Sequence, residues 1–303
     1  MTLKQLEAFY WAATLGSFAI AAERLHITQS TLSKRIAELE DYLGCRLFDR
    51  SRKKAGLTEA GERLVPQCRA MLDLAKSIPQ SLQDSDDDRP LTGVCRFGLS
   101  ELSASTWLPH AIDRIRARHP QLMLEPQICL TRELERLVLR GEIDFAVIAG
   151  VPINASINEE PVAKVKFSWV ASPRLGLERR TLTAEDFSRM NVLTHPPDSG
   201  LAAAFNGWLA THNLKVRRAI VCNSLTAITG LTVANMGISF LPESYVQPLL
   251  QSGRLVALES TPPLPDLTYS FIWLKDDPRP MVRVMRKLLL PGIDFSIPNE
   301  LWT

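Results

Sequence analysis

The sequence lacks any apolar run near the ~20 residues that a membrane-spanning helix needs. It also lacks the motifs of common catalytic sites: it contains no GxSxG, no P-loop, no GxGxxG after a strand and no HExxH. Its five histidines and five cysteines have spacings that fit neither a metal site nor a disulfide framework. We therefore expect no enzyme, no metal or other cofactor, and no membrane insertion.

The first residues lack a basic leader, an apolar core of signal length and a small-residue cleavage site, which predicts a cytoplasmic protein. In that reducing compartment most of the cysteines are expected to be small core residues. The formal net charge is only +2, unlike that of a protein that binds nucleic acid over its whole surface. A local patch matters more than the sum, and four cations gather within residues 50–54.

Three helical patterns occupy residues 3–43. Apolar residues from Leu3 to Ala13 recur at helical spacing, a short alanine-rich pattern covers residues 18–25, and a third runs from Gln29 to Leu43. The last two are separated by a turn of three residues, 26–28. These proportions predict a helix-turn-helix.

The third helix has a buried stripe of leucine and isoleucine and a polar face near its N-terminus. Glutamine can pair with adenine through two hydrogen bonds, and lysine or arginine can reach guanine or phosphate. A solvated polar face would have the same composition. The sequel favours DNA, because Leu47 and Phe48 precede the basic run and Leu57 follows it, which predicts a hairpin wing with cations at its tip.

Residues 3–61, with the stretches AAERLHITQSTLSKRIAELEDYLGCRLFDR and LTEAG, resemble the DNA-binding domain of LysR-type transcriptional regulators. The resemblance implies that the following residues lie at or near DNA: Thr28, Gln29, Ser30, Thr31, Ser33, Lys34, Arg35, Arg50, Arg52, Lys53 and Lys54. Arg24 and Glu40 lie off the reading face, so we expect them to be structural, as paired charges on packed helices.

A long helical stretch follows Thr58, a natural N-cap. Its apolar residues alternate in steps of four and three, which indicates two helices packed lengthwise; they are Leu64, Cys68, Met71, Ala75, Ile78 and Leu82. Packing on its own effector domain is the alternative, and Pro66 and Pro79 favour kinks. The resemblance implies antiparallel homodimer contacts here and a homotetramer. The acidic segment 83–90 is expected to be a hinge.

Beyond residue 90, short apolar strands alternate with helices, which predicts a doubly wound α/β fold. The stretches RFGLSELSASTWLPHAIDRIRARHP, LRGEIDFAVIAG and NMGISFLPES resemble the LysR-type effector domain more weakly. The resemblance implies two small lobes like those of a periplasmic binding protein, with the chain crossing between them twice. The expected divisions are a winged helix-turn-helix at 1–58, a linker helix and hinge at 59–90, and an effector domain at 91–303, with lobe I at 91–161 and 268–303 and lobe II at 162–267.

Ligands in such folds lie beyond the carboxyl ends of the strands. The candidate effector residues at strand ends and helix starts are Ser100, Glu101, Ser103, Thr131, His195 and Ser224. For the hydroxyl residues, helix capping is the alternative; for His195 it is a solvated or capping loop histidine. Glu101 would repel a carboxylate effector unless it points away or has a cation nearby, and would suit an amine or hydroxyl instead. Redox sensing is not expected, because Cys222 is the single cysteine of the second lobe.

A solute-binding protein for transport would share the two lobes but would not need the basic wing. The sequence therefore predicts a sequence-specific transcription regulator whose binding to promoter DNA is modulated by a small-molecule effector in the cleft. Recognition helices of a dimer of dimers would enter successive major grooves of an inverted repeat. Effector binding would change subunit packing, DNA bend and contact with RNA polymerase.

Overall fold

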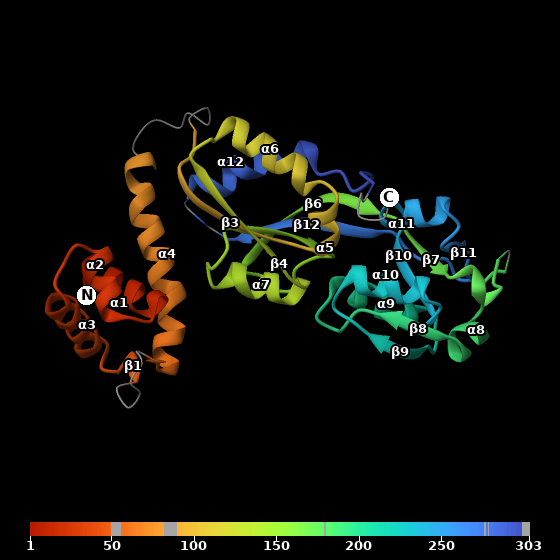
Figure 1. Cartoon of the computed structure of the whole chain (residues 1–303), viewed down its shortest axis with the longest axis horizontal. Helices are drawn as coiled ribbons and strands as arrows, with labels where there is room; N and C mark the ends of the chain where they lie inside the picture. The colour runs from red at the N-terminus through yellow and green to blue at the C-terminus, as the bar shows by residue number, and fades with distance from the viewer. Residues whose placement is uncertain (50–55, 82–89, 179, 276, 278, 299–303) are drawn as a thin grey trace. The chain divides into compact units, whose positions relative to one another are not determined.

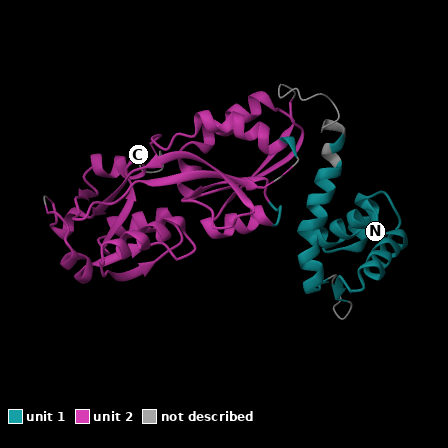
Figure 2. Ribbon diagram, turned by 180° about the vertical axis from the view of Figure 1, so that it is seen from behind, with its two compact units in different colours: residues 1–87, 140–142, 278–280 teal, residues 88–139, 143–277, 281–303 magenta. Residues whose placement is uncertain are grey.

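The computed structural model describes residues 1–49, 56–81, 90–178, 180–275, 277 and 279–298. The chain divides into two compact units (Figure 2), one made mainly of residues 1–87 and the other of residues 88–139, 143–277 and 281–303. Among the described helices, none combines the length and the apolar character that a bilayer crossing requires.

Three short helices form the core of the N-terminal unit: α1 (Leu3–Leu15), α2 (Phe18–Arg24) and α3 (Gln29–Leu43). Each begins at a hydroxyl N-cap that accepts a hydrogen bond from a backbone N–H three residues on, and the caps are Thr2, Ser17 and Thr28. The stripe predicted for the third helix is buried between the others at Leu32, Ile36 and Leu39. The predicted helix-turn-helix is confirmed.

The predicted hairpin is also present. Strands β1 (Phe48–Asp49) and β2 (Gly56–Leu57) pair antiparallel. The Phe48 ring holds the hairpin on the helices, with its centroid 5.6 Å from that of Phe9 and 5.0 Å from that of Phe18. The tip that carries Arg50, Arg52, Lys53 and Lys54 lies outside the described residues.

Glu40 is a buried carboxylate that ties the third helix to the first strand of the wing. Its Oε1 accepts the backbone N–H of Leu47 at 2.8 Å and of Phe48 at 3.3 Å, and its Oε2 accepts Arg46 Nη1 at 2.7 Å. Burial alone would raise the pKa of the Glu40 carboxyl, but these donors together hold the pKa below its usual value. Arg24 instead stacks over the Trp11 ring at 3.6 Å. Both residues are therefore structural, as expected. Glu40 is paired with a charge, although its partner Arg46 lies just after α3 and not on another helix, whereas Arg24 packs on an aromatic ring.

Helix α4 (Glu59–Ser81) begins at Thr58, whose hydroxyl accepts the N–H of Gly61. It runs without a break through Pro66. Its first half packs on the N-terminal core, where Cys68 is fully buried. Met71 and Ile78 of the second half are 43% and 51% exposed. Only the later part of the predicted seam therefore offers an apolar surface.

The larger unit contains two five-stranded mixed sheets, here called lobe I and lobe II with their helices (Figure 1). The lobe I sheet has the order β4-β3-β5-β12-β6. Its strands are β3 (Gly93–Leu99), β4 (Leu122–Ile128), β5 (Phe145–Ala149), β6 (Ile157–Val165) and β12 (Leu267–Leu274). Its helices are α5 (Glu101–Ser105), α6 (Leu108–Arg118), α7 (Thr131–Leu139) and α12 (Pro280–Leu289).

Successive residues of β5 point to opposite faces of the lobe I sheet. Phe145 and Val147 belong to the core beneath α6 and α12, whereas Ala146 and Ile148 belong to the core beneath α7. Figure 1 shows these helices on the two faces. All five residues of β5 are buried. The predicted α/β layering is confirmed for this lobe.

The lobe II sheet has the order β11-β7-β10-β8-β9. Its strands are β7 (Phe167–Ala171), β8 (Asn191–Thr194), β9 (Arg217–Val221), β10 (Ile238–Pro242) and β11 (Val256–Leu258), and its helices are α8 (Ala184–Arg189), α9 (Gly200–Thr211), α10 (Leu225–Val233) and α11 (Glu243–Gln251). Phe240 of β10 packs against Phe205 of α9, while the adjacent Ser239 bonds Thr232 of α10. Helices α9 and α10 therefore cover opposite faces.

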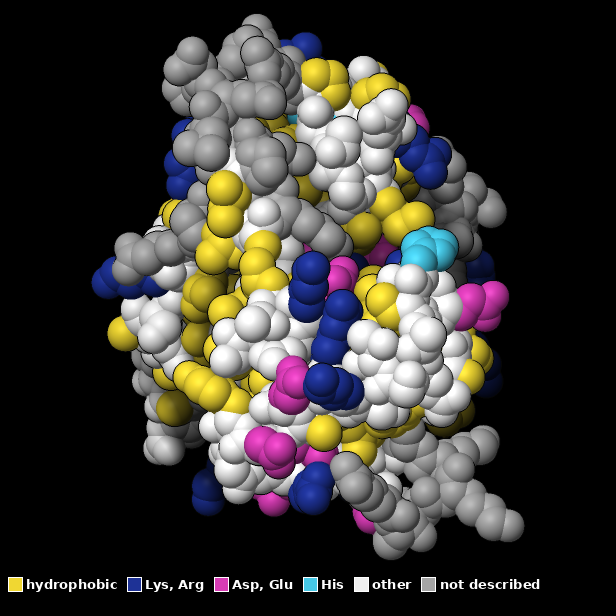
Figure 3. Space-filling view, turned by 90° about the vertical axis from the view of Figure 1, so that its left-hand side faces the viewer, with side chains coloured by type: hydrophobic (Ala, Val, Ile, Leu, Met, Phe, Trp, Pro, Cys, Tyr) yellow, Lys and Arg dark blue, Asp and Glu magenta, His cyan; other side chains and the backbone are white. Residues whose placement is uncertain are grey.

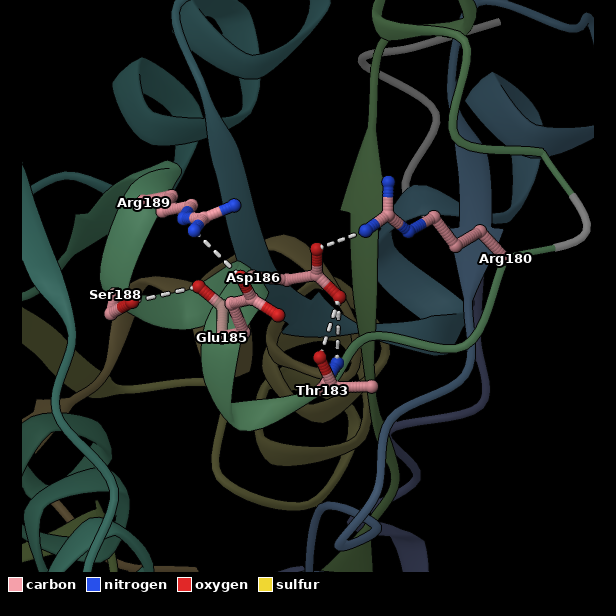
Figure 4. Close-up of polar contacts among 6 residues, drawn as sticks. All are labelled: Arg180, Thr183, Glu185, Asp186, Ser188 and Arg189. Atoms are coloured by element: carbon pink, nitrogen blue, oxygen red, sulfur yellow. Dashed lines mark hydrogen bonds and ion pairs between the residues drawn. The ribbon is translucent and has the colours of Figure 1, made fainter.

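Helix α8 is fixed at its start by a reciprocal capping box (Figure 4). Asp186 accepts the backbone N–H and the hydroxyl of Thr183, and also pairs with Arg180. Arg189 and Glu185 form a further ion pair at 2.7 Å. These contacts hold Phe187 against Trp169 of the sheet, so this polar group serves packing.

Two expectations for the larger unit need correction. The longest strand, β6, was not predicted; it pairs antiparallel with β12 up to Val165, so lobe I extends beyond the expected border at residue 161. Both sheets also contain antiparallel pairs, around β12 and β7, and are not simple doubly wound sheets. The chain does cross between the lobes twice, after Val165 and before Leu267.

Replacing Glu40 by alanine is expected to weaken the N-terminal unit by about 3 kcal/mol, because the buried N–H of Leu47 loses its acceptor and Arg46 its partner. Hydrogen exchange at the amides of Leu47 and Phe48 should accelerate accordingly. The matched control is Glu38→Ala, which removes an exposed carboxylate bonded to Gln5 and should cost under about 1 kcal/mol. Equal effects of the two substitutions would contradict the role given to Glu40.

Candidate functional site

Two regions of the chain bring the predicted site residues together, one in each unit. The first is the N-terminal end of α3. Seven of the predicted DNA contacts lie within the described residues. Five of them are exposed: Thr28, Gln29, Ser30, Ser33 and Lys34. Thr31 and Arg35 are half-buried. All seven lie within the first two turns or at the cap.

Thr28 has a structural role of its own. Its hydroxyl accepts the N–H of Thr31 at 3.2 Å and shares hydrogen bonds with the Ser30 and Thr31 hydroxyls at 2.9 and 2.8 Å. This network fixes the first turn of α3 and leaves Gln29 and Lys34 projecting to solvent. A helix N-terminus carries free N–H groups and a partial positive charge, which suit a phosphate.

The opposite side of α3 is buried on Leu32, Ile36 and Leu39, so the helix has one apolar and one polar face. Figure 3 shows that one side of the molecule carries lysine and arginine side chains next to acidic and hydrophobic ones. Glutamine, serine, lysine and arginine on an exposed helix can meet base edges and phosphates in a major groove. This arrangement can read DNA.

The second region is a cavity of about 120 Å³ within the larger unit. It is lined by residues of both lobes: Ser100, Glu101, Leu102, Ile128, Cys129, Leu130, Thr131, Ala149, His195, Ser199, Leu201, Asn223, Leu225, Pro242 and Tyr269. Ser100 follows β3, Thr131 follows β4 and His195 follows β8, so the lining lies at the carboxyl ends of parallel strands.

Four of the six predicted effector residues line this cavity, namely Ser100, Glu101, Thr131 and His195. Ser103 does not: it is fully buried, and its hydroxyl and N–H both bond the Ser100 hydroxyl. Ser224 is not among the lining residues either. It caps α10 through the N–H of Ala227, which is the capping alternative open to such residues.

Glu101 does not project freely into the cavity. Its carboxylate reaches from the start of α5 in lobe I to the first turn of α10 in lobe II. Oε2 accepts the N–H of Leu225 at 2.7 Å, and Oε1 accepts the N–H and the hydroxyl of Thr226 at 2.9 and 2.6 Å. The Ser224 hydroxyl adds a longer bond of 3.3 Å. The sequence suggested a nearby cation or an outward direction for Glu101, whereas its partners are backbone N–H and hydroxyl groups of the other lobe.

Thr131 bridges the lobes as well. Its hydroxyl accepts the N–H of Gly200 at 3.0 Å, and the next N–H, that of Arg132, donates to the Asp198 carbonyl oxygen at 3.1 Å. Gly200, the first residue of α9, lies so close to Ala149 that a β-carbon there would overlap the Ala149 carbonyl oxygen. The lobes therefore touch at backbone distance on this side of the cavity.

His195 is 8% exposed, and both ring nitrogens are buried without a hydrogen-bond partner among the described residues. Burial lowers the pKa of His195 to about 4, although the nearby Glu101 opposes that shift. The imidazole is thus neutral near pH 7 and offers one donor and one acceptor. It is not a solvated loop histidine.

The cysteines are mostly covered. Cys68 and Cys95 are buried, Cys129 and Cys222 are half-buried, and Cys45 is exposed. Burial raises the pKa of the Cys129 thiol, and Glu133 adds to the effect. A thiol with a raised pKa is a poor nucleophile. The lining thiol therefore contributes bulk to the cavity.

Comparison with known proteins gives two family matches. A model of the LysR substrate binding domain matches residues 88–293, and a model of the bacterial regulatory helix-turn-helix protein of the lysR family matches residues 3–62. The chain is 29% identical over 267 residues to the uncharacterized HTH-type transcriptional regulator YeiE of Escherichia coli strain K12, covering 88% of each protein.

Two solved structures have a similar fold. Full-length OxyR from Pseudomonas aeruginosa is 23% identical with a TM-score of 0.72, over 99% of this chain and 98% of the other. CbnR complexed with its target DNA is 21% identical with a TM-score of 0.64, over 97% and 100% of the two chains. At these identities the likeness concerns the fold.

The stability of the larger unit is expected to fall in acid because of His195. Below its ordinary pKa near 6.5 the unfolded chain binds a proton at this residue, whereas the folded chain does not until about pH 4. Stability is therefore lost as the pH falls between these values, by roughly 2 kcal/mol at pH 5. His195→Asn should remove this loss.

Urea unfolding of the wild type and the variant at pH 7.5 and pH 5 measures the effect. The difference in unfolding free energy between the two proteins at pH 7.5 gives the cost of altered packing. The change in that difference between pH 7.5 and pH 5 reports the titration of His195. A difference that stays constant between the two pH values would contradict the neutral buried imidazole.

Proposed function

Because the chain belongs to the LysR family of helix-turn-helix transcriptional regulators, we propose that it binds promoter DNA sequence-specifically and that a small molecule in the cavity of its effector domain modulates this binding. The observation that carries the proposal is the joint presence of a capped, exposed polar turn on α3 and a two-lobed domain with a cavity lined by both lobes. A solute-binding protein for transport would not need the polar turn of α3. A protein that only binds DNA would not need the cavity.

In this proposal α3 enters the major groove with Gln29, Ser33 and Arg35 toward the bases, while Lys34 and the helix N-terminus meet phosphates. Thr28, Ser30 and Thr31 stabilise the first turn of α3 and approach the DNA backbone. The wing residues Arg50, Arg52, Lys53 and Lys54 would add phosphate contacts from the adjoining groove.

The effector acts through the two lobes. A ligand shifts an equilibrium only by its differential affinity for two states. Here the two states would differ in lobe closure, since side chains of both lobes line the cavity. Closure would alter the packing of subunits and with it the DNA bend and contact with RNA polymerase.

We assign DNA binding to residues 1–58, dimerisation and the hinge to residues 59–90, and effector binding to residues 91–303. The proposed assembly is a dimer through α4 that pairs into a tetramer, as a symmetric inverted-repeat site requires. It would act in the cytoplasm, where promoter DNA lies. We propose no catalytic step for the chain.

DNA binding is tested by fluorescence anisotropy on the DNA that flanks the gene, with salt varied. Arg35→Ala is expected to weaken specific binding by about 10- to 100-fold through a lost base contact. Lys34→Ala should lower the salt slope by about one unit, because one phosphate contact is lost.

Lys164→Ala is the matched control, since it removes an exposed lysine from β6 in the effector domain. It should leave both the affinity and the salt slope unchanged. Binding no tighter than to random DNA, with all three substitutions silent, would overturn the proposed function.

Dimerisation is expected to depend on the exposed apolar part of α4. Met71→Asp and Ile78→Asp each place a charge in that surface, which should weaken self-association at least tenfold in sedimentation equilibrium. Gln67→Asp, at an exposed polar position of the same helix, is the control and should leave the mass unchanged. If the three variants associate like the wild type, the interface lies elsewhere.

A further inference from the structure

The N-terminus of α10 already holds an anion that belongs to the protein. Leu225 and Thr226 supply the first two N–H groups of this nine-residue helix, and both donate to the Glu101 carboxylate. Such N–H groups have no partner within the helix and attract negative charge. Glu101 therefore occupies the place at α10 that the carboxylate of a ligand would otherwise take.

The hydroxyls around this contact are ordered by it. Thr226 Oγ1 lies 2.6 Å from Glu101 and 2.9 Å from the Tyr245 hydroxyl. Because a carboxylate accepts hydrogen bonds, the Thr226 proton goes to Glu101 and the Tyr245 hydroxyl donates to Thr226. The contact is built from two helices of lobe II and one of lobe I.

Two other helix ends at the cavity, those of α9 and α7, also have protein acceptors. The N–H of Gly200, at the start of α9, is bonded to Thr131, and the N–H of Arg132, at the start of α7, is bonded to Asp198. Both bonds join lobe I to lobe II. At least one first-turn donor at each of these three ends is thus already bonded across the cleft.

The groups that remain available to a ligand include a buried imidazole and a carboxylate. The His195 ring lacks partners within the described chain, is more than nine-tenths buried and lines the cavity. Glu101 is the one acidic side chain of the lining, and its Oε2 has a single donor, Leu225, among the described contacts. The lining also contains the polar side chains of Ser100, Ser199, Asn223 and Tyr269. Apolar side chains, including Leu130, Leu201 and Pro242, complete it.

We propose that this cavity binds a small amine or amide that carries no anionic group, with its N–H donors toward Glu101 Oε2 and the acceptor nitrogen of His195. The inference rests on the proposed function, whose effector it specifies. A volume of about 120 Å³ is slightly below the ~150 Å³ of a cavity that holds benzene, so the ligand has about six non-hydrogen atoms. A monoanion some 4 Å from Glu101 would bind roughly a thousandfold more weakly than its neutral counterpart.

The test uses three probes that share a three-carbon chain, propionate, propionamide and propylammonium, added to the full-length protein without DNA. Binding is followed by calorimetry and by the rise in melting temperature. The wild type is expected to prefer propionamide and propylammonium over propionate. In Glu101→Ala the preference should reverse, because propionate can now fill the vacated position at α10, with at least a tenfold gain in its affinity.

Two further variants keep the outcome decisive. Glu101→Asp shortens the side chain but retains the charge, so it should remain insensitive to propionate; a response there would show general loosening instead of a vacated anion position. Glu101→Gln retains the volume but removes the charge, so it should gain propionate affinity through the lost repulsion even if the alanine variant folds poorly. The proposal is overturned if all the proteins rank the three probes alike, or if propionate binds the wild type as tightly as propionamide.

Failure of this proposal is distinguishable from failure of the proposed function. The probe measurements report on the cavity alone, whereas anisotropy with promoter DNA reports on α3. A regulator that binds its DNA site but prefers propionate would retain the function and lose the assigned ligand class.

Discussion

The two lobes of the effector domain are joined by only two chain segments, and these lie next to each other. Leu267, where the chain returns to lobe I, is paired with Val165, where it leaves. A pair of adjacent strands restrains the twisting of one lobe against the other. The distance between the lobes depends on the contacts that they make at the cleft. The hydrogen bonds from Glu101 to α10 and from Thr131 to α9 join the lobes there. Both contacts border the cavity, because Glu101 and Thr131 belong to its lining.

Much of the N-terminal unit could be predicted from the sequence because its signals are local. Hydroxyl caps at Thr2, Ser17 and Thr28 and the buried stripe of the third helix depend on residues a few positions apart. The role of Glu40 could not be predicted in the same way. Its donors at Leu47 and Phe48 become neighbours only after the chain turns back toward α3.

The larger unit was harder to predict for two physical reasons. Strand β6 is half-exposed, contains Pro161 and several charges, and so lacks the apolar pattern that marked the buried β5. The direction of Glu101 depends on a helix that begins more than a hundred residues later. Its position after a strand could be inferred, but its hydrogen-bond donors could not. A signal was present in Ser224-Leu225-Thr226, a capped helix start in need of an acceptor.

Gly200 gives the separation of the lobes an unusually simple chemical basis. Since a β-carbon at this residue would overlap the Ala149 carbonyl oxygen, the smallest side chain would act as a wedge between α9 and β5. The close approach of α9 to β5 thus requires the absence of one methyl group, at a residue whose bond to Thr131 uses only its backbone. A substitution at residue 200 would therefore change the spacing of the lobes while leaving every side chain that lines the cavity as it is.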